Sequence, residues 1–337
     1  MAISRFPVGR ASWPARGSAL LTVLWISAAL SAVVFSLAST VRGETERVAT
    51  DFDGLRAYYL AVGAVDRAIV EILWQRNLND TRIGRGAPWV DYTFPSGAAR
   101  VEMIPETAKL DVNSVGLIPL LRMLDAMGVD PARAQAIAQG IVARRSGGPL
   151  SASFSTGPTF QYPSASFQEI EELLSVPGVT PEIMYGTWVP VENPREDEPR
   201  LVRRGGLADC LSVFGSKGRI NANSADPATL AAVGILPEGV NMLVRARQVK
   251  WLDDAALGRL MPMLGPGGAA LGFESHSIFT IRATAGIWLP GQAALVGSPN
   301  RKVSDVRRTV AAQVKFMPPD YDSWIHILRW YDTAWSN

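Results

Sequence analysis

The feature that most constrains the fold is an uninterrupted apolar segment near the N-terminus. Residues 18–41 carry no charged side chain and are rich in Ala, Leu, Val and Ser. About 20 apolar residues in a helix are enough to cross a lipid bilayer. Arg5, Arg10 and Arg16 precede the segment without any acid, and basic residues of this kind stay on the cytoplasmic side. We therefore predict a transmembrane helix that sends the rest of the chain across the membrane.

The helical pattern continues beyond this segment, since no proline occurs between Pro14 and Pro88. Apolar residues recur at helical spacing along one stripe, which consists of Val48, Phe52, Leu55, Tyr59, Val62, Ile69 and Leu73. The pattern predicts a single helix from about residue 18 to residue 74. Its first half is apolar on all sides and its second half on one face only.

An ordinary secretory signal peptide is the alternative for this segment. The apolar core of a signal peptide has only ~7–15 residues before a small-residue cleavage site. Ser36-Leu37-Ala38 could serve as such a site. Under this alternative the chain is a secreted hydrolase whose mature N-terminus lies near Ser39.

Composition argues against most enzyme classes and against nucleic-acid binding. The chain has one cysteine, Cys210, and two histidines, His276 and His326, and it lacks the sequence motifs of the common catalytic sites. Cys210 is therefore predicted to be a small buried side chain. Without the three leader arginines the net charge of +2 turns to −1, whereas nucleic-acid binders usually keep a basic surplus in their folded part.

Beyond residue 88 the pattern changes to strands. Residues 89–94 and 99–104 flank a turn at Pro95-Ser96-Gly97, and a short extended piece follows at 109–113. Near the C-terminus, segments 277–289, 303–316 and 324–331 are also rich in strand-forming residues. Strict alternation in the last segment predicts two faces, one with Trp324, His326, Leu328 and Trp330, the other with Ile325, Ile327, Arg329 and Tyr331.

Residues 114–271 are predicted to be mostly helical and contain an internal repeat. Segments 109–114 and 219–224 share the pattern basic-apolar-Asx-apolar-Asn-Ser, and each precedes a helical run that ends in arginines. Their Asn and Ser residues are candidate N-caps, and Asp130-Pro131 and Asp226-Pro227 predict a cap followed by a first-turn proline. The pairs of helices resemble helix-hairpin-helix modules, which elsewhere bind the DNA backbone.

The N-terminal junction carries a family resemblance. Arg16-Gly17 immediately before Ser18-Ala19-Leu20-Leu21 resembles a prepilin peptidase site with cleavage after Gly17. The basic leader, the apolar helix and its amphipathic continuation resemble type IV pilins and pseudopilins. Most pilins carry Glu at the fifth mature position, where this chain has Thr22. The K-type minor pseudopilin of the type II secretion system also lacks this glutamate, is the largest of its class and contains a helical insertion, so the chain is similar to that family.

The resemblance implies an α+β fold in which a long N-terminal helix packs on an antiparallel sheet interrupted by the helical insertion. The expected division is 1–17 leader, 18–41 transmembrane helix, 42–113 first part of a pilin-like domain, 114–271 insertion and 272–337 second part. The implied protein spans the inner membrane of a Gram-negative cell once, keeps its soluble part in the periplasm, and is no catalyst.

The resemblance also implies partners and a place in an assembly. The partners are the I-, J- and H-type minor pseudopilins, the major pseudopilin, the prepilin peptidase and the inner-membrane secretion platform. With them the protein forms or caps the tip of the pseudopilus. Some family members hold Ca²⁺, and Asp320, Asp322 and the acids of segment 192–198 are candidate ligands without an assigned set. A membrane-tethered DNA-uptake protein remains the rival, although Glu169, Glu171 and Glu172 beside the first hairpin disfavour phosphate binding.

Overall fold

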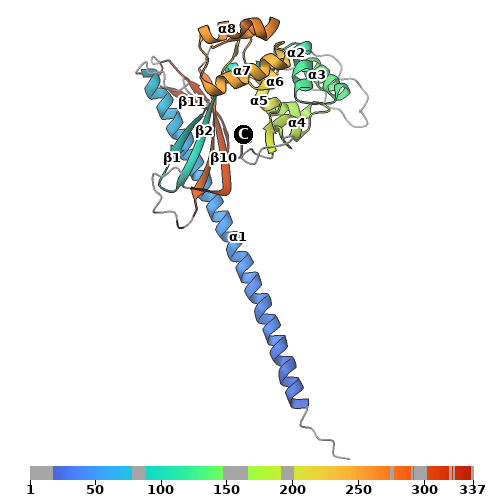
Figure 1. Cartoon of the computed structure of the whole chain (residues 1–337), viewed down its shortest axis with the longest axis vertical. Coiled ribbons are helices and arrows are strands. Elements are labelled where there is room, and N and C mark those ends of the chain that lie inside the picture. The colour runs from blue at the N-terminus through green and yellow to red at the C-terminus, as the bar shows by residue number, and fades with distance from the viewer. Residues whose placement is uncertain are drawn as a thin grey trace, which may run out of the picture. The chain divides into compact units, whose positions relative to one another are not determined.

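The computed structural model describes residues 18–77, 89–146, 166–190, 201–273, 277–289, 291, 302–318, 321 and 323–334. The chain forms two units, Met1–Leu55 and Arg56–Asn337. In the first unit, the described residues all belong to helix α1, which runs over Ser18–Asn77 (Figure 1). The predicted single long helix is therefore confirmed. The second unit contains the remainder of α1 and every other element.

The second unit contains a five-stranded antiparallel sheet in the order β1-β2-β9-β10-β11. Its strands are β1 (Trp89–Thr93), β2 (Gly97–Pro105), β9 (Ile278–Trp288), β10 (Val303–Phe316) and β11 (Ile325–Tyr331). The predicted turn between β1 and β2 is present, where the Phe94 amide donates to the Gly97 carbonyl at 2.8 Å. The predicted strand segments are thus confirmed, and β10 has the expected bounds.

One face of the sheet packs against α1 and forms the sheet cluster, the hydrophobic core shared by these elements. On α1 this core uses Leu60, Ala61, Ala64, Val65, Ala68, Ile69 and Ile72. The predicted apolar stripe is only partly the buried face. Ile69 belongs to it, whereas Tyr59 is 65% exposed. The helix turns an alanine-rich neighbouring face to the sheet because small side chains allow the two backbones to approach closely.

The two faces predicted for β11 are wrong because the strand contains a bulge. Val314 of β10 pairs with Ile327 and Gln313 with Arg329, so Leu328 is the extra residue. The shift places Ile325 and Trp330 on the same side, where both pack against the sheet cluster. Sequence alternation holds only where each residue has one partner on the next strand.

The insertion folds as two similar modules that share one core, the insertion cluster. The first module contains α2 (Leu117–Ala126) and α3 (Pro131–Ser146), and the second contains α6 (Pro227–Ala232) and α7 (Pro237–Val249). Each module starts with a short strand that pairs in parallel with a strand at its end. The short strands are β3 (Leu110–Asp111) with β6 (Leu211–Ser212) and β7 (Ile220–Asn221) with β8 (Leu271–Gly272). The internal repeat is therefore confirmed.

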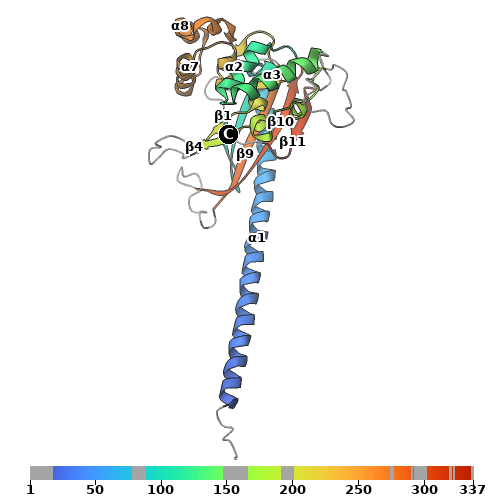
Figure 2. The same cartoon turned by 90° about the vertical axis from the view of Figure 1, so that its right-hand side faces the viewer.

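Shorter elements complete the insertion. They are the 3-10 helices η1 (Glu106–Ala108), η2 (Ile170–Ser175) and η3 (Gly265–Ala270), the helices α4 (Pro181–Tyr185), α5 (Leu207–Cys210) and α8 (Asp254–Leu264), and the hairpin of β4 (Thr187–Pro190) and β5 (Leu201–Arg204). Figure 2 shows the same elements after a quarter turn. The α+β class, with a helix packed on an antiparallel sheet and a mostly helical insertion, is confirmed.

The predicted helix caps are right at the aspartates and wrong at the asparagines. Asp130 Oδ1 accepts from the Ala132 amide at 3.0 Å, and Asp226 Oδ1 accepts from the Ala228 amide at 2.8 Å. Helix α2 instead begins after Gly116, which provides no side-chain cap. Asn113 and Asn223 have different partners, described below.

Candidate functional site

The candidate site is the first part of α1, in which the apolar side chains are exposed. Leu20, Trp25 and Phe35 are 77%, 73% and 77% exposed. In the described part of the chain, α1 is the helix that is long and apolar enough to cross a membrane by length and composition. Large apolar side chains in water are unfavourable, whereas the same side chains in lipid are in their preferred solvent.

The hydroxyl groups of this segment bond to the backbone of their own helix. Ser27 Oγ donates to the Leu24 carbonyl at 2.9 Å, and Ser39 and Thr40 donate to the Ser36 carbonyl at 2.8 and 2.9 Å. A polar group in hydrocarbon is costly unless it is hydrogen-bonded. The serines and threonines therefore remain compatible with an apolar environment.

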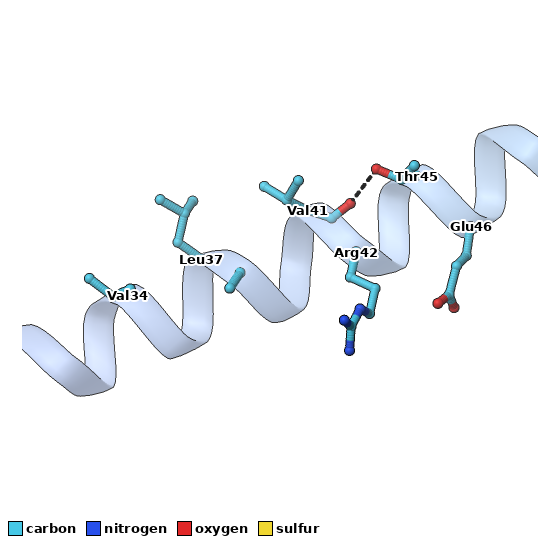
Figure 3. A pocket seen from close by; sticks show the side chains of 7 residues that line it. Val34, Leu37, Val41, Arg42, Thr45 and Glu46 are labelled. Atoms are coloured by element: carbon cyan, nitrogen blue, oxygen red, sulfur yellow. Dashed lines mark hydrogen bonds between the residues drawn. The ribbon is translucent and has the colours of Figure 1, made fainter.

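The apolar segment of α1 ends at Arg42, where charged side chains begin. A shallow hollow along α1 is lined by Val34, Leu37, Ala38, Val41, Arg42, Thr45 and Glu46. Figure 3 shows that Val34, Leu37 and Val41 come before the charged residues Arg42 and Glu46 along the helix. The Thr45 hydroxyl donates to the Val41 carbonyl at 2.8 Å. All of these side chains come from one helix, so the hollow is a surface feature and does not enclose a ligand.

Of the predicted residues at the N-terminal junction, Ser18 and Thr22 lie in the described part of α1. Gly17 is outside the described residues, and Ser18 is the first residue of α1. Thr22 lies on the exposed surface of the first turns. The cleavage after Gly17 stays a prediction.

Two contacts fix the second part of α1 on the sheet. The Tyr92 hydroxyl of β1 donates to Glu71 Oε2 at 2.6 Å, and the Tyr58 hydroxyl donates to Asp332 Oδ1 at 2.7 Å. Burial raises the pKa of Tyr92, and the neighbouring Glu71 carboxylate raises it further. The phenol stays protonated at physiological pH and keeps its bond to the helix.

The two asparagines of the internal repeat make the same contacts in both modules. Asn113 exchanges two hydrogen bonds with the backbone of Phe167, at 3.0 and 2.7 Å. Asn223 exchanges two with the backbone of Leu252, at 3.0 and 2.9 Å. Each side chain therefore closes its own module by holding the segment that follows the second helix.

The arginines at the ends of the helical runs also have equivalent internal partners. Arg145 donates to the carbonyls of Val112 and Val115, both at 2.7 Å. Arg247 donates to the carbonyls of Ala222 and Ala225 at 3.1 and 2.7 Å. Burial lowers the pKa of both arginines. These side chains stabilise the insertion and are not presented to a phosphate, so the DNA-binding alternative is not favoured.

The other candidates from the sequence that lie in the described residues, Cys210 and His326, differ in their surroundings: one is buried and the other is exposed. Cys210 is buried, its Sγ lies 3.6 Å from Asp226 Oδ1, and burial raises its pKa, as fits the predicted structural role. His326 is exposed on β11. In the described ranges, no group of three His, Cys, Asp or Glu could hold a metal ion. His276, Trp335, Asp320, Asp322 and segment 192–198 lie outside the described residues.

Sequence reasoning missed a set of ion pairs between the sheet and the insertion. Arg282 of β9 contacts Asp209 of α5 in the insertion at 3.4 Å, and within the sheet it also contacts Glu102 of β2 at 2.9 Å. Arg329 of β11 contacts Glu169 and Glu171 at 3.0 and 2.9 Å. The only available signal was the alternation of β9, which places Arg282 opposite the apolar face.

Comparison with known proteins gives similar solved structures but no family. No protein-family model matches the chain, and no curated protein does either. The chain is similar to one chain of the crystal structure of the GspK-GspI-GspJ complex from the type 2 secretion system of enterotoxigenic Escherichia coli. The similarity has a TM-score of 0.45 and 14% sequence identity, and it covers 86% of this chain and 98% of the other.

Proposed function

We propose that this protein is a minor pseudopilin of a type II secretion system, of the K type. The observation that carries the proposal is α1 itself. It is one helix over Ser18–Asn77 that exposes its uncharged first part, and Arg16-Gly17 precedes Ser18 in the sequence. A cleaved basic leader followed at once by such a helix is what the pilin class requires for membrane insertion and for assembly.

The proposed sequence of events begins with cleavage after Gly17 and methylation of Ser18. The mature protein stays in the inner membrane through residues 18–41, with its soluble part in the periplasm. The helix then leaves the bilayer and packs among the helices of the I-, J- and H-type subunits and the major pseudopilin. Prepilin peptidase and the inner-membrane platform are the remaining partners, and a cytoplasmic ATPase supplies the energy. The protein itself is no catalyst.

An exposed stripe supports the assembly role of α1. Val34, Val41, Val48 and Leu55 follow one another at intervals of seven residues and are 62%, 57%, 64% and 50% exposed. Apolar residues at this spacing form the contact seam when helices pack along one another. Small residues in the apolar segment, including Ala28, Ala29 and Ala32, allow close helix approach within the membrane.

Thr22 supports a unique position in the filament. An N-terminal ammonium group in apolar surroundings is costly unless a negative charge lies nearby. A glutamate at the fifth mature position offers that charge to a neighbouring subunit, and Thr22 does not. From the resemblance to K-type minor pseudopilins, and in agreement with Thr22, we place the protein at the tip, where it forms or caps the pseudopilus and helps to drive folded proteins across the outer membrane. The binding of Ca²⁺, with no assigned ligand set, is part of the same proposal.

The direct test is the N-terminus of the native protein. Mass spectrometry of the purified membrane fraction should find a mature chain that begins with methylated Ser18. A mature chain beginning near Ser39 would instead indicate an ordinary signal peptide and a secreted protein, and would remove the proposal. Binding of the intact protein to DNA, with the salt dependence of phosphate contacts, would favour the rival.

A further inference from the structure

The sheet presents a polar face to the insertion. On β9, Ile281, Ala283 and Ala285 belong to the sheet cluster, so the alternate residues Thr280, Arg282 and Thr284 point to the other side. The insertion has its own separate hydrophobic cluster. The two cores are therefore not continuous, and the contacts named between them are hydrogen bonds and ion pairs.

These contacts concentrate at two points that differ in exposure. At the first point the side chains of Arg282, Glu102 and Asp209 are 3%, 17% and 10% exposed. Asp209 also accepts from Arg203 at 2.6 Å and from the Gly206 amide at 3.0 Å. Burial raises the pKa of Asp209, but the two arginines and these hydrogen bonds outweigh burial and lower it overall.

At the second point the Arg329–Glu169 pair is closer to water, whereas the contacting Glu171 Oε2 is buried. The side chains of Arg329, Glu169 and Glu171 are 31%, 59% and 20% exposed. A cavity of about 140 Å³ lies beside this point, with Glu106, Lys109, Thr280 and Arg329 in its wall. Because its wall includes Glu106 and Thr280 as well as Arg329, the cavity extends from this point toward the first one, and the contact between the insertion and the sheet is incompletely filled there.

The chain enters the insertion near the buried point. Glu106 of η1 follows β2 directly, and its Oε1 accepts from the Thr280 hydroxyl at 2.5 Å. Thr280 is close to Arg282 along β9. A covalent connection and a buried ion network thus coincide on this side, whereas the contacts described on the other side are the ion pairs of Arg329 with Glu169 and Glu171.

We propose that the insertion is hinged on the sheet at Arg282–Asp209 and opens at Arg329–Glu169–Glu171 as ionic strength rises. Salt at 1 M screens exposed charges beyond about 3 Å, while buried pairs are screened much less. The exposed pairs therefore weaken first, and the insertion swings as one body because its own core is unaffected. This device is independent of the proposed function.

The test uses the full-length protein in nonionic detergent with spin labels at Gln139→Cys on α3 and Ile327→Cys on β11. Both positions are exposed, and the native Cys210 is buried and does not compete for the label. At 0.1 M salt the distribution of distances between the labels should have a single narrow peak. At 1 M salt a second, longer distance should appear, with the open fraction rising on the order of fivefold.

Arg329→Gln should produce the longer distance already at 0.1 M salt. Arg100→Gln is the matched control, because Arg100 makes an exposed ion pair with Asp91 at 2.8 Å inside the sheet and does not touch the insertion. The proposal is overturned if neither salt nor Arg329→Gln changes the distance, or if Arg100→Gln changes it equally. If Arg329→Gln does not fold, the deciding measurement is the change in label distance between 0.1 M and 1 M salt in the protein that retains Arg329.

Discussion

Residues 18–55 and 56–77 belong to the same helix, yet their apolar side chains differ in size and in surroundings. The first part carries large, exposed groups such as Trp25, Phe35 and Phe52. The second part buries alanines, with Ala57, Ala61, Ala64 and Ala68 each 0% exposed. The difference shows that the second part already has its packing partner, the sheet, whereas the first part is built for surroundings that lie outside this chain.

The largest expected effect comes from the start of the first part. Gly17→Glu should block cleavage, because the predicted peptidase site requires the small residue before Ser18, and should leave an unprocessed chain without secretion. Immunoblots of cell membranes measure the size of the chain. Gly9→Glu, inside the leader but away from the junction, is the control and should be processed normally. A normally processed and secretion-competent Gly17→Glu protein would contradict the proposed function.

A charge in the first part separates the lipid-facing segment from the rest of the helix. Leu30→Arg should cost about 3 kcal/mol of insertion free energy, because a charged side chain then lies near the middle of the bilayer. Val48→Arg is the control, since Val48 lies beyond Arg42 and outside the predicted span. Alkaline carbonate extraction measures membrane insertion. Equal extraction of both variants would show that residues 18–41 do not span the membrane.

A larger side chain in the second part tests the alanine face. Ala64→Leu should destabilise the fold by about 1–3 kcal/mol, because extra methyl groups force the helix away from the sheet. Ala49→Leu, at an exposed position of the same helix, should leave stability unchanged. Thermal unfolding in detergent measures both. If Ala49→Leu were as destabilising as Ala64→Leu, the two parts of the helix would not differ in packing.

The bond between Tyr92 and Glu71 gives a smaller, pH-dependent effect. Tyr92→Phe should lower stability at neutral pH by about 1 kcal/mol, because one buried hydrogen bond is lost. The pKa of Tyr92 is raised in the folded state, so its contribution is full below the unfolded pKa of about 10 and is lost as pH rises above that value. The free energy of unfolding, measured between pH 7 and 11, should therefore fall more steeply with pH for the native chain than for Tyr92→Phe.

Thr22→Glu should have the smallest effect. The added carboxylate sits at the exposed start of α1, so the fold should stay the same, but the protein should lose its preference for the tip and secretion should fall partially. Cross-linking to the other minor pseudopilins measures tip placement. Unchanged cross-linking and secretion would show that the fifth mature position does not determine placement. Thr22→Ser is the conservative control.

Local patterns in the sequence predicted most of the fold. The long N-terminal helix, the bounds of β10 and the caps at Asp130 and Asp226 each depend on neighbouring residues, and each is found. The bulge at Leu328 was missed because it depends on the pairing with β10. The buried face of α1 was misplaced for a similar reason. Alanines are weak hydrophobic signals, and only the approach of the sheet selects them.

The polar contacts of the insertion were the least predictable part. Arg282 and Asp209 are 73 residues apart in sequence, and no local pattern indicates that they meet. The repeated asparagines were recognised as a motif, but their partners Phe167 and Leu252 lie far along the chain from them. The apolar start of α1 shows the opposite behaviour. Its candidate role follows from composition alone, because a bilayer selects side chains without regard to tertiary structure.

The extra residue at Leu328 has a consequence for how such molecules come together. Strand β11 is the last strand of the sheet, and an unguarded outer strand invites a strand from another molecule. The irregular spacing at Leu328 and the charge of Arg329 interrupt the regular ladder that such an addition needs. The addition of a further strand at this edge of the sheet is thereby disfavoured.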